Sequence, residues 1–440
     1  MLKMSSQTCG TYVFIPGKNW KLSLAELVSF LEARRARFEV CVFSREFFAV
    51  NIHDDANVRD IADFGGIIKI GSASKSFSTD LLADAFLRAN KESKTRIKEE
   101  ITTNGLIDGM LDKASGKFTF GVSVYNAEES LRPVSKMIQR FVGSAIKKEL
   151  RAQGVKAGFM GFARDRQQPQ LTHVEVLKKN MVENKAEALF CMGKQQTWLA
   201  VTTGVHDPFE FQKRDIGKPR QRKIFAMPPR LARIMVNLSF CTPGKVLLDP
   251  FCGVGTILQE ALLAKANVLG MDLNPWCVEA AKENLEWLKT EYSLKSAEYR
   301  VLRGDALGLA KKVGQGVDCI VTEPDLGPAL RDVPTTPYAL KIVEKLKPLF
   351  FGFLTEAYRV LVSGGRLVLV TPYFKTRSGK PVRMPVDEKA EEIGFKRAYP
   401  FRKEYFAEEH EAVQSLVGTR SMWDVAERHK VGREIHIFQK

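Results

Sequence analysis

The 440-residue chain has no long apolar run, no closely paired cysteines, and few acidic residues for its number of basic ones. Its longest apolar run, 348–354, is far too short to cross a bilayer. The first ten residues, MLKMSSQTCG, lack the apolar core of a signal peptide. The seven cysteines are odd in number and none forms a C-x-x-C pair, which argues against a disulfide framework or a zinc site. We therefore expect a cytoplasmic protein with reduced cysteines, no metal site and no membrane span.

The basic excess is large: 67 Lys and Arg stand against 51 Asp and Glu, a net charge of +16. It favours a polyanionic partner, with nucleic acid ahead of an anionic membrane. Two segments hold most of it, 131–180 with eleven basic and three acidic residues, and 213–233 with eight and one. A solvated helix face normally mixes both signs, so this concentration predicts a surface that contacts an RNA backbone. The residues expected on that surface are Lys136, Arg140, Arg151, Lys156, Arg164, Arg166, Arg220 and Arg222.

The most informative stretch is 246–260, VLLDPFCGVGTILQE. A short apolar strand ends at Asp249, Gly253 and Gly255 permit a sharp turn, and an apolar helix follows. A strand, a glycine turn and a helix N-terminus together form a pocket for a nucleotide-like ligand. The spacing differs from the dinucleotide fingerprint, because Leu258 stands where the third glycine would be.

The next three predicted strands also end in carboxylates, at Asp272, Asp305 and Glu323. Asp272 lies 19 positions after Gly253, where an acid that binds ribose hydroxyls is expected. Ligands of open parallel sheets bind at the carboxyl ends of the strands, so we expect these acids and Asp249 to converge. Helix capping would explain one such acid more readily than four in register.

The order D-P-F-C-G-V-G, then Asp272, then G-D-A, then T-E-P-D-L-G resembles the class I S-adenosylmethionine-dependent methyltransferases, in particular the branch that methylates amino groups. The resemblance implies a Rossmann-like α/β sheet and S-adenosyl-L-methionine as cofactor. In that branch the turn backbone binds the methionine part, the second acid binds the ribose and the third contacts adenine. The residues implied to bind the cofactor are Asp249, Gly253, Gly255, Asp272, Leu273, Asp305 and Ala306.

The fourth motif of that branch is usually (D/N)-P-P-(Y/F), and here it reads Glu323, Pro324, Asp325, Leu326. An exocyclic amine on a base is a poor nucleophile because its lone pair is delocalised into the ring. By resemblance, Glu323 and the Pro324 carbonyl accept the two amine hydrogens and aim the lone pair at the sulfonium methyl, so the rate comes from positioning and electrostatics. Leu326 cannot stack as an aromatic does, which forfeits about 1–3 kcal/mol per base. The rings that could replace it are Tyr338, Tyr373 and Phe374.

The first 70 residues alternate strands and helices in the β-α-β-β-α-β order of a ferredoxin-like unit. Ser23 is expected to cap the first helix. The predicted strands are 12–15, 37–43, 47–52 and 66–70, and the second helical segment is 58–64.

A second α/β region is predicted at 71–203, followed by a Pro- and Gly-rich linker at 204–229 and the methyltransferase domain at 230–440. The long amphipathic helix of the second region, 131–153, is expected to end at Gly154. The predicted strands of the second region are 117–125, 172–178, 186–192 and 197–201, and the chain is expected to close with a strand at 433–438.

A ferredoxin-like unit followed by an α/β region of this size resembles the N-terminal part and THUMP domain of tRNA-modifying enzymes, on segments 118–124 and 172–177 and the basic helix. Residues 214–222, RDIGKPRQR, resemble the linker of the tRNA methyltransferases that modify the N2 amine of guanosine 10. Residues 228–235, PPRLARIM, fit the helix that closes over the cofactor in that family. The resemblance implies tRNA as the partner and methyl transfer to the N2 amine of a tRNA guanosine, foremost at position 10.

The residues leave two alternatives open. The first keeps the chemistry but changes the target, to another tRNA guanosine, ribosomal RNA or DNA. The second is a non-catalytic RNA-binding protein with a vestigial methyltransferase fold, motivated by the altered motif from Glu323 to Leu326. Relatives of the family sometimes act with a small zinc-binding activator protein, and that partner also stays open.

Overall fold

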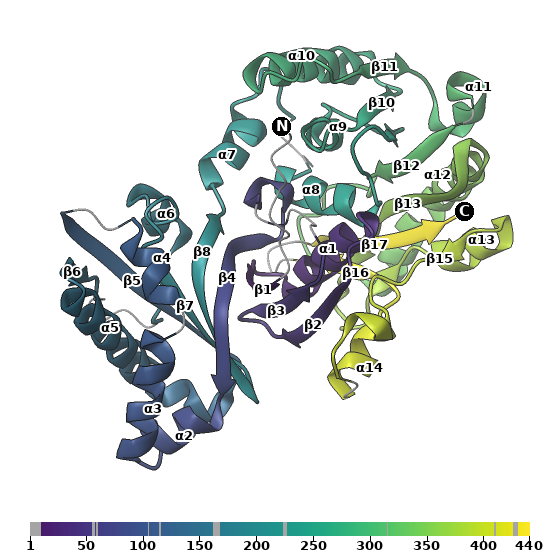
Figure 1. Ribbon diagram of the computed structural model, residues 1–440. Helices are drawn as coiled ribbons and strands as arrows, with labels where there is room; N and C mark the ends of the chain where they lie inside the picture. The colour runs from purple at the N-terminus through teal and green to yellow at the C-terminus, as the bar shows by residue number, and fades with distance from the viewer. Residues whose placement is uncertain are drawn as a thin grey trace.

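The computed structural model describes residues 10–54, 58, 60–103, 105–113, 116–161, 168–222, 227–314, 316–408, 411–425 and 430–440. In this part of the chain the strands form two sheets, each covered by helices (Figure 1). None of the described helices is both long and apolar enough to cross a membrane.

The first sheet has eight strands in the order β2-β3-β1-β4-β8-β7-β5-β6. Its first four strands have the order and the antiparallel pairing of a ferredoxin-like unit. The bounds of this unit are β1 (Gly10–Pro16), α1 (Trp20–Ala33), β2 (Phe38–Phe43), β3 (Phe48–Ile52), the 3₁₀ turn η1 (Ile61–Asp63) and β4 (Ile67–Ser78).

Two local predictions in this unit are wrong. Helix α1 begins at Trp20, because the Asn19 side chain caps it by accepting a hydrogen bond from the Leu22 amide at 3.4 Å. Ser23 lies inside α1, where its hydroxyl donates to the Gly66 carbonyl at 2.9 Å. The expected second helix is reduced to the single turn η1, which Asp60 caps.

The second α/β region continues the same sheet, because β4 runs past residue 70 and pairs with β8. The expected boundary between residues 70 and 71 therefore falls within one strand. The elements of this region are α2 (Asp80–Phe86), α3 (Lys91–Thr102), α4 (Leu106–Leu111), β5 (Lys117–Asn126), η2 (Glu129–Val134), α5 (Ser135–Ala152), β6 (Lys156–Phe159), α6 (His173–Lys178), β7 (Glu187–Met192) and β8 (Gln196–Val205).

The strand predicted at 172–178 is wrong, because this segment forms the helix α6. Thr172 and Glu175 make a capping box: the Thr172 hydroxyl accepts from the Glu175 amide, and the Glu175 carboxylate accepts from the Thr172 amide. Two backbone N–H groups at the helix start are thus satisfied, which outweighs the strand preference of the valines. The long basic helix is confirmed as α5, and Gly154 follows it with a left-handed φ of 85°.

The second sheet follows the order β11-β10-β9-β12-β13-β17-β15, with β14 on β13 and β16 on β17. β9 to β13 run parallel, and β17, the predicted last strand, is antiparallel to β13. This is the expected Rossmann-like sheet, whose strand order reverses direction between β9 and β12. Its elements are β9 (Val246–Asp249), α9 (Thr256–Leu263), β10 (Asn267–Asp272), α10 (Pro275–Glu291), β11 (Tyr299–Arg303), η3 (Ala306–Gly308), α11 (Leu309–Val313), β12 (Val317–Thr322), α12 (Thr336–Val360), β13 (Leu361–Phe374), β14 (Val382–Arg383), α13 (Val386–Ile393), β15 (Lys396–Arg397), η4 (Lys403–Tyr405), α14 (Glu411–Val417), β16 (Met422–Asp424) and β17 (Val431–Gln439).

Helix α8 (Pro229–Leu238) joins the two sheets, and α7 (Pro208–Ile216) lies within the segment expected to be a linker. α8 packs between α1 and α9, so side chains such as Leu24, Met235 and Leu258 belong to one continuous apolar core. The N-terminal unit and the methyltransferase-like sheet are thus parts of one packed body.

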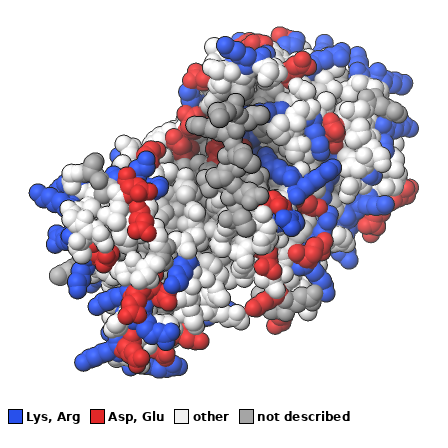
Figure 2. Space-filling view, in the orientation of Figure 1, with Lys and Arg blue, Asp and Glu red and all other residues white. Residues whose placement is uncertain are grey.

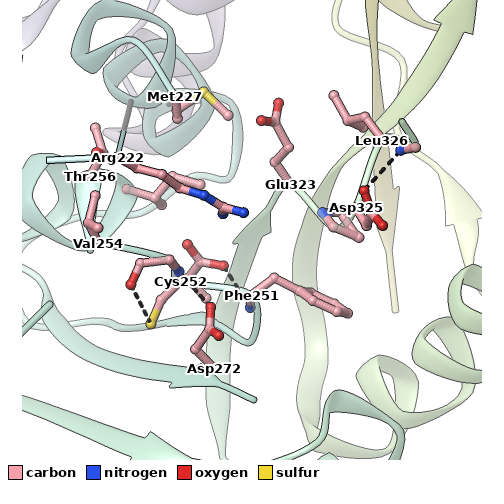
Figure 3. Close-up of a pocket in the computed structure, with 15 residues that line it drawn as sticks. Arg222, Met227, Phe251, Cys252, Val254, Thr256, Asp272, Glu323, Asp325 and Leu326 are labelled. Carbon is pink, nitrogen blue, oxygen red and sulfur yellow. Dashed lines mark hydrogen bonds between the residues drawn. The ribbon is translucent and has the colours of Figure 1, made fainter. Parts of the chain in front are cut away.

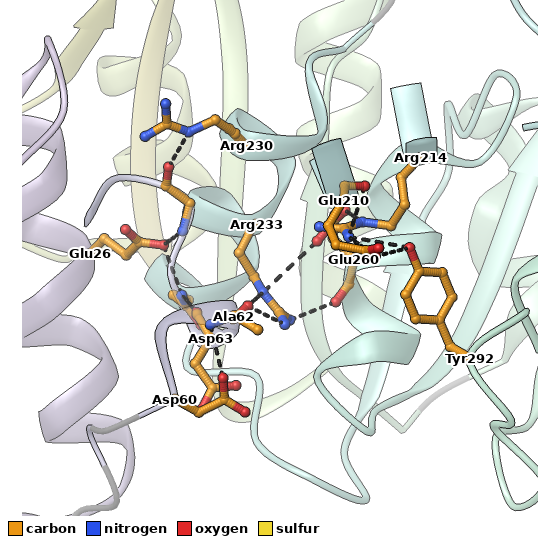
Figure 4. A network of polar contacts seen from close by, with 12 residues as sticks. Glu26, Asp60, Ala62, Asp63, Glu210, Arg214, Arg230, Arg233, Glu260 and Tyr292 are labelled. Atoms are coloured by element: carbon orange, nitrogen blue, oxygen red, sulfur yellow. Dashed lines mark hydrogen bonds and ion pairs between the residues drawn. The ribbon is translucent and has the colours of Figure 1, made fainter. Parts of the chain in front are cut away.

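Polar contacts reinforce this junction (Figure 4). Arg230 of α8 donates to the Gly65 carbonyl at 2.7 Å. Arg233 donates to the Ala62 carbonyl at 2.9 Å and, on the other side, to the Glu260 carbonyl at 2.8 Å. Buried hydrogen bonds made by a charged donor are among the stronger ones, so α8 is fixed on both faces.

Candidate cofactor pocket and active site

A cavity of about 400 Å³ lies at the carboxyl ends of β9, β10 and β12, where the strand order reverses (Figure 3). This is the position at which open parallel sheets bind ligands. Its described lining residues are Arg222, Met227, Asp249, Phe251, Cys252, Gly253, Val254, Thr256, Ile257, Asp272, Glu323, Pro324, Asp325, Leu326 and Gly327.

The glycine turn after β9 contributes Cys252, Gly253 and Val254 to the lining of this cavity. Gly253 and Gly255 have φ values of 51° and 86°, which L side chains rarely adopt. The Gly253 amide donates to Asp272 Oδ2 at 2.9 Å, and the Asn274 amide donates to Asp272 Oδ1 at 2.8 Å. Asp272 therefore ties the turn to β10, and each of its oxygens keeps a lone pair for a further donor.

Asp249 is the most deeply buried acid of the cavity. Its Oδ1 accepts from the Thr322 hydroxyl at 2.6 Å and from the Phe251 amide at 3.1 Å. Burial raises the pKa of Asp249 to about 7, and the negative charges of Asp272 and Glu323 act in the same direction. The two hydrogen bonds oppose this shift without cancelling it.

The fourth motif reaches the cavity at the end of β12. Glu323, Pro324, Asp325 and Leu326 all line it, and Asp325 shapes the turn by accepting a hydrogen bond from the Gly327 amide at 2.9 Å. Tyr338, Tyr373 and Phe374 are not among the described lining residues.

Four other residues were also expected at the site. Asp305 follows β11, and its carboxylate caps η3 by accepting a hydrogen bond from the Leu307 amide at 3.0 Å. Ala306 is the next residue and begins η3. Leu273 has 67% of its surface exposed, and Gly255 stands at the start of α9. These four residues are not among the described lining residues.

Arg433 is a site residue that sequence reasoning missed. Its Nε and a terminal nitrogen donate to the two carboxylate oxygens of Glu323 at 2.5 and 3.2 Å. The side chains are only 12% and 11% exposed. The signal in the sequence was an arginine at the start of the predicted last strand, 433–438.

The basic segment 213–233 is largely engaged within the protein. Arg220 pairs with Glu283 at 2.6 Å, outside the cavity. Arg222 lines the cavity, where its guanidinium points inward and contacts no described residue through a hydrogen bond or ion pair (Figure 3). The six cations of the segment with a partner in the described structure are Lys213, Arg214, Lys218, Arg220, Arg230 and Arg233.

The basic residues of α5 and β6 remain on the surface. Lys136, Arg140 and Arg151 of α5 and Lys156 of β6 are exposed and have no ion pair with any described residue. Basic side chains lie along the left edge of the molecule in Figure 2, with acidic side chains among them toward its lower end. The expected RNA contacts Arg164 and Arg166 lie outside the described residues.

Comparison with protein-family models shows which class of domain this chain resembles. Residues 219–378 match the family model UPF0020, described as an RMKL-like methyltransferase domain. A DNA methylase family model matches residues 114–283, of which only the last part falls on the second sheet. With the Rossmann-like sheet, the first match identifies 219–378 as a methyltransferase domain, as the motifs predicted.

The relatives are more specific. A tRNA (guanine(10)-N2)-dimethyltransferase of Methanothermobacter thermautotrophicus is 36% identical over 160 residues, which cover 36% of this chain and 43% of that protein. An enzyme of the same name from Pyrococcus abyssi is 35% identical over 134 residues, 30% of this chain and 38% of that protein. The match thus spans less than half the length of each relative. The resemblance to tRNA guanine-N2 methyltransferases is confirmed, while the THUMP interpretation of 71–203 stays a prediction.

Among solved structures, TrmN from Thermus thermophilus is 17% identical, with a TM-score of 0.49 and coverage of 98% of this chain and 99% of that chain.

Proposed function

We propose that this chain transfers a methyl group from S-adenosyl-L-methionine to the exocyclic N2 amine of a guanosine in tRNA, with guanosine 10 as the target. One observation carries the proposal: Glu323 and Pro324 open onto the same cavity as the glycine turn, Asp249 and Asp272. The residues that would orient the amine and the residues that would bind the cofactor therefore line one cavity.

The cavity's charges fit this cofactor, which bears an ammonium and a sulfonium. Asp249 would receive the ammonium and Asp272 the ribose hydroxyls, while Asp305 at the neighbouring strand end would approach adenine. Arg222 is the only lysine or arginine among the described lining residues, and it would face the cofactor's carboxylate. When bound, the cofactor supplies an electrophilic methyl group.

The protein's part in the reaction is orientation. The Glu323 carboxylate and the Pro324 carbonyl accept one hydrogen bond each from the two N–H groups of the amine, which turns its lone pair toward the methyl carbon. Methyl transfer would leave the bound cofactor as S-adenosylhomocysteine, and the Glu323 carboxylate would take up the proton that the methylated amine loses and pass it to solvent. Preorganised acceptors of this kind lower the barrier because they need no rearrangement during the reaction.

Mass spectrometry of nucleosides tests the proposal. After incubation of the purified chain with tRNA and cofactor, digestion should yield N2-methylated guanosine, and mapping should place it at position 10. Product at another tRNA guanosine, in ribosomal RNA or in DNA would support the retargeted alternative. Cofactor binding without product on any of these nucleic acids would contradict catalysis and favour the RNA-binding alternative.

Cofactor affinity should depend on pH through Asp249. In the free protein this carboxyl is half-protonated near pH 7, and an ammonium beside it favours the ionised form. Binding below pH 7 therefore releases a proton, so affinity for S-adenosylhomocysteine should rise about tenfold or more from pH 5.5 to 8 by calorimetry. Asp249→Asn, which keeps an acceptor oxygen, should flatten this dependence. The same pH dependence in the variant would contradict the assignment.

Binding of tRNA should weaken steeply with salt, with a log–log slope of several units. Replacing both Lys136 and Arg140 of α5 with glutamine should flatten the slope by roughly 1–2 units and leave cofactor affinity unchanged. The control replaces Lys311 and Lys312, two exposed lysines of α11, and should keep the parental slope. Equal slopes for the two double variants would refute the surface on α5.

A further inference from the structure

We propose that Arg433 is a positioning residue, which holds the Glu323 carboxylate in the orientation that receives the target amine. The inference rests on the proposed function and extends it to a residue outside all four motifs. Glu323 is one methylene longer than the aspartate or asparagine usual at this position, and Arg433 is what fixes that longer side chain.

The sheet order explains how the two residues meet. Arg433 lies on β17 opposite Pro372 of β13, and β13 separates β17 from β12. Glu323 directly follows β12. The arginine side chain therefore crosses the end of β13 to reach Glu323, a contact between residues 110 positions apart.

The contact is a two-pronged one. Nε and a terminal nitrogen of the guanidinium each meet a different carboxylate oxygen, at 2.5 and 3.2 Å. A planar fork of this kind fixes both the position and the plane of a carboxylate, which a lysine ammonium cannot do. Each oxygen retains a lone pair, so Glu323 can still accept an amine hydrogen.

The surroundings make Arg433 a stable partner. The pair is almost buried, and the third charged group at this point, Asp424 of β16, lies 3.7 Å from another guanidinium nitrogen. Burial lowers the pKa of Arg433, but the charge and hydrogen bonds of Glu323 and the charge of Asp424 together outweigh it, so the net shift is upward and the guanidinium stays charged. The neighbouring pair of Arg383 and Glu434 uses the next residue of β17 and does not reach the cavity.

A longer side chain has one more rotatable bond, so an unheld Glu323 would sample several orientations and few of them would face the amine. Arg433 removes this freedom before the substrate arrives. Its effect is therefore expected in the reacting complex and not in cofactor affinity, because Arg433 itself is absent from the described cavity lining.

The first test is a double-mutant cycle on single-turnover methylation of tRNA at saturating cofactor. Arg433→Gln should lower the rate about 30-fold or more while S-adenosylhomocysteine affinity changes less than twofold. Arg433→Lys should recover little of the loss. The double variant Arg433→Gln with Glu323→Gln should be no slower than Glu323→Gln alone, because one residue acts through the other. Arg383→Gln is the matched control and should stay near the parental rate.

Two results would overturn the inference: a parental rate in folded Arg433→Gln, or losses that simply multiply in the double variant. A second measurement does not depend on activity. Crystal structures of the parent and of Arg433→Gln should show one Glu323 orientation in the parent and several in the variant. A single unchanged orientation in the variant refutes the positioning role even if the chain methylates no RNA, whereas an inactive parent with a held Glu323 refutes only the proposed function.

Discussion

Replacing Glu323 with alanine should lower single-turnover methylation of tRNA by about 10²-fold or more. Removing a preorganised polar group from an active site costs on the order of 3–4 kcal/mol of transition-state stabilisation. The rate should fall less in Glu323→Gln, because glutamine keeps one acceptor oxygen, although its amide nitrogen then faces the donors of Arg433. Glu323→Asp restores the residue usual in this branch but withdraws it from the guanidinium, so it too should be slower than the parent.

The specificity of this result depends on two checks. S-adenosylhomocysteine affinity should remain near the parental value in all three variants, since the loss is expected in the reacting complex. Glu388→Ala, at an exposed acid of α13, should leave the rate unchanged. If Glu323→Ala methylates tRNA at the parental rate, another residue orients the amine and the assignment of the fourth motif is wrong.

Asp272→Ala should weaken cofactor binding about tenfold or more in calorimetry. Hydrogen bonds to a charged acceptor contribute roughly 1.5–3 kcal/mol, and this carboxylate is expected to receive them from the ribose. It also accepts the Gly253 and Asn274 amides, so the substitution should loosen the glycine turn as well.

A comparison with Asp305→Ala separates the two strand-end acids. Asp305 is not among the described residues that line the cavity, so its removal should cost less affinity than removal of Asp272. Parental affinity in a folded Asp272→Ala protein would contradict the assignment of this cavity as the cofactor site.

The core of the candidate site could be predicted because its signals are local. The glycine turn, the strand before it and the acids at the strand ends lie within short stretches of sequence. Once the strands are parallel and adjacent, Asp249, Asp272 and Glu323 must meet at one edge. The same reasoning placed Asp305 there too, but it follows the outermost strand, β11, and lies beyond the described cavity lining.

What could not be predicted depends on partners distant in the chain. Arg433 meets Glu323 only because β17 inserts next to β13, and nothing near either residue indicates that strand order. The basic segment at 213–233 had the composition of an exposed surface, yet Arg230 and Arg233 satisfy backbone carbonyls within the junction. Competition between local signals explains the remaining errors, as at Thr172, where a capping box determined the structure of a valine-containing segment.

The apolar face that α8 shares with both sheets has a consequence for how the molecule unfolds. Because Leu24, Met235 and Leu258 belong to one core, melting either the N-terminal unit or the second sheet exposes apolar surface of the other. Calorimetry should then record a single cooperative transition for the N-terminal unit and the second sheet. The second sheet and its helices could not be fused to a foreign partner without α1, since the fusion would leave an apolar surface of α8 and α9 exposed to water and prone to aggregation.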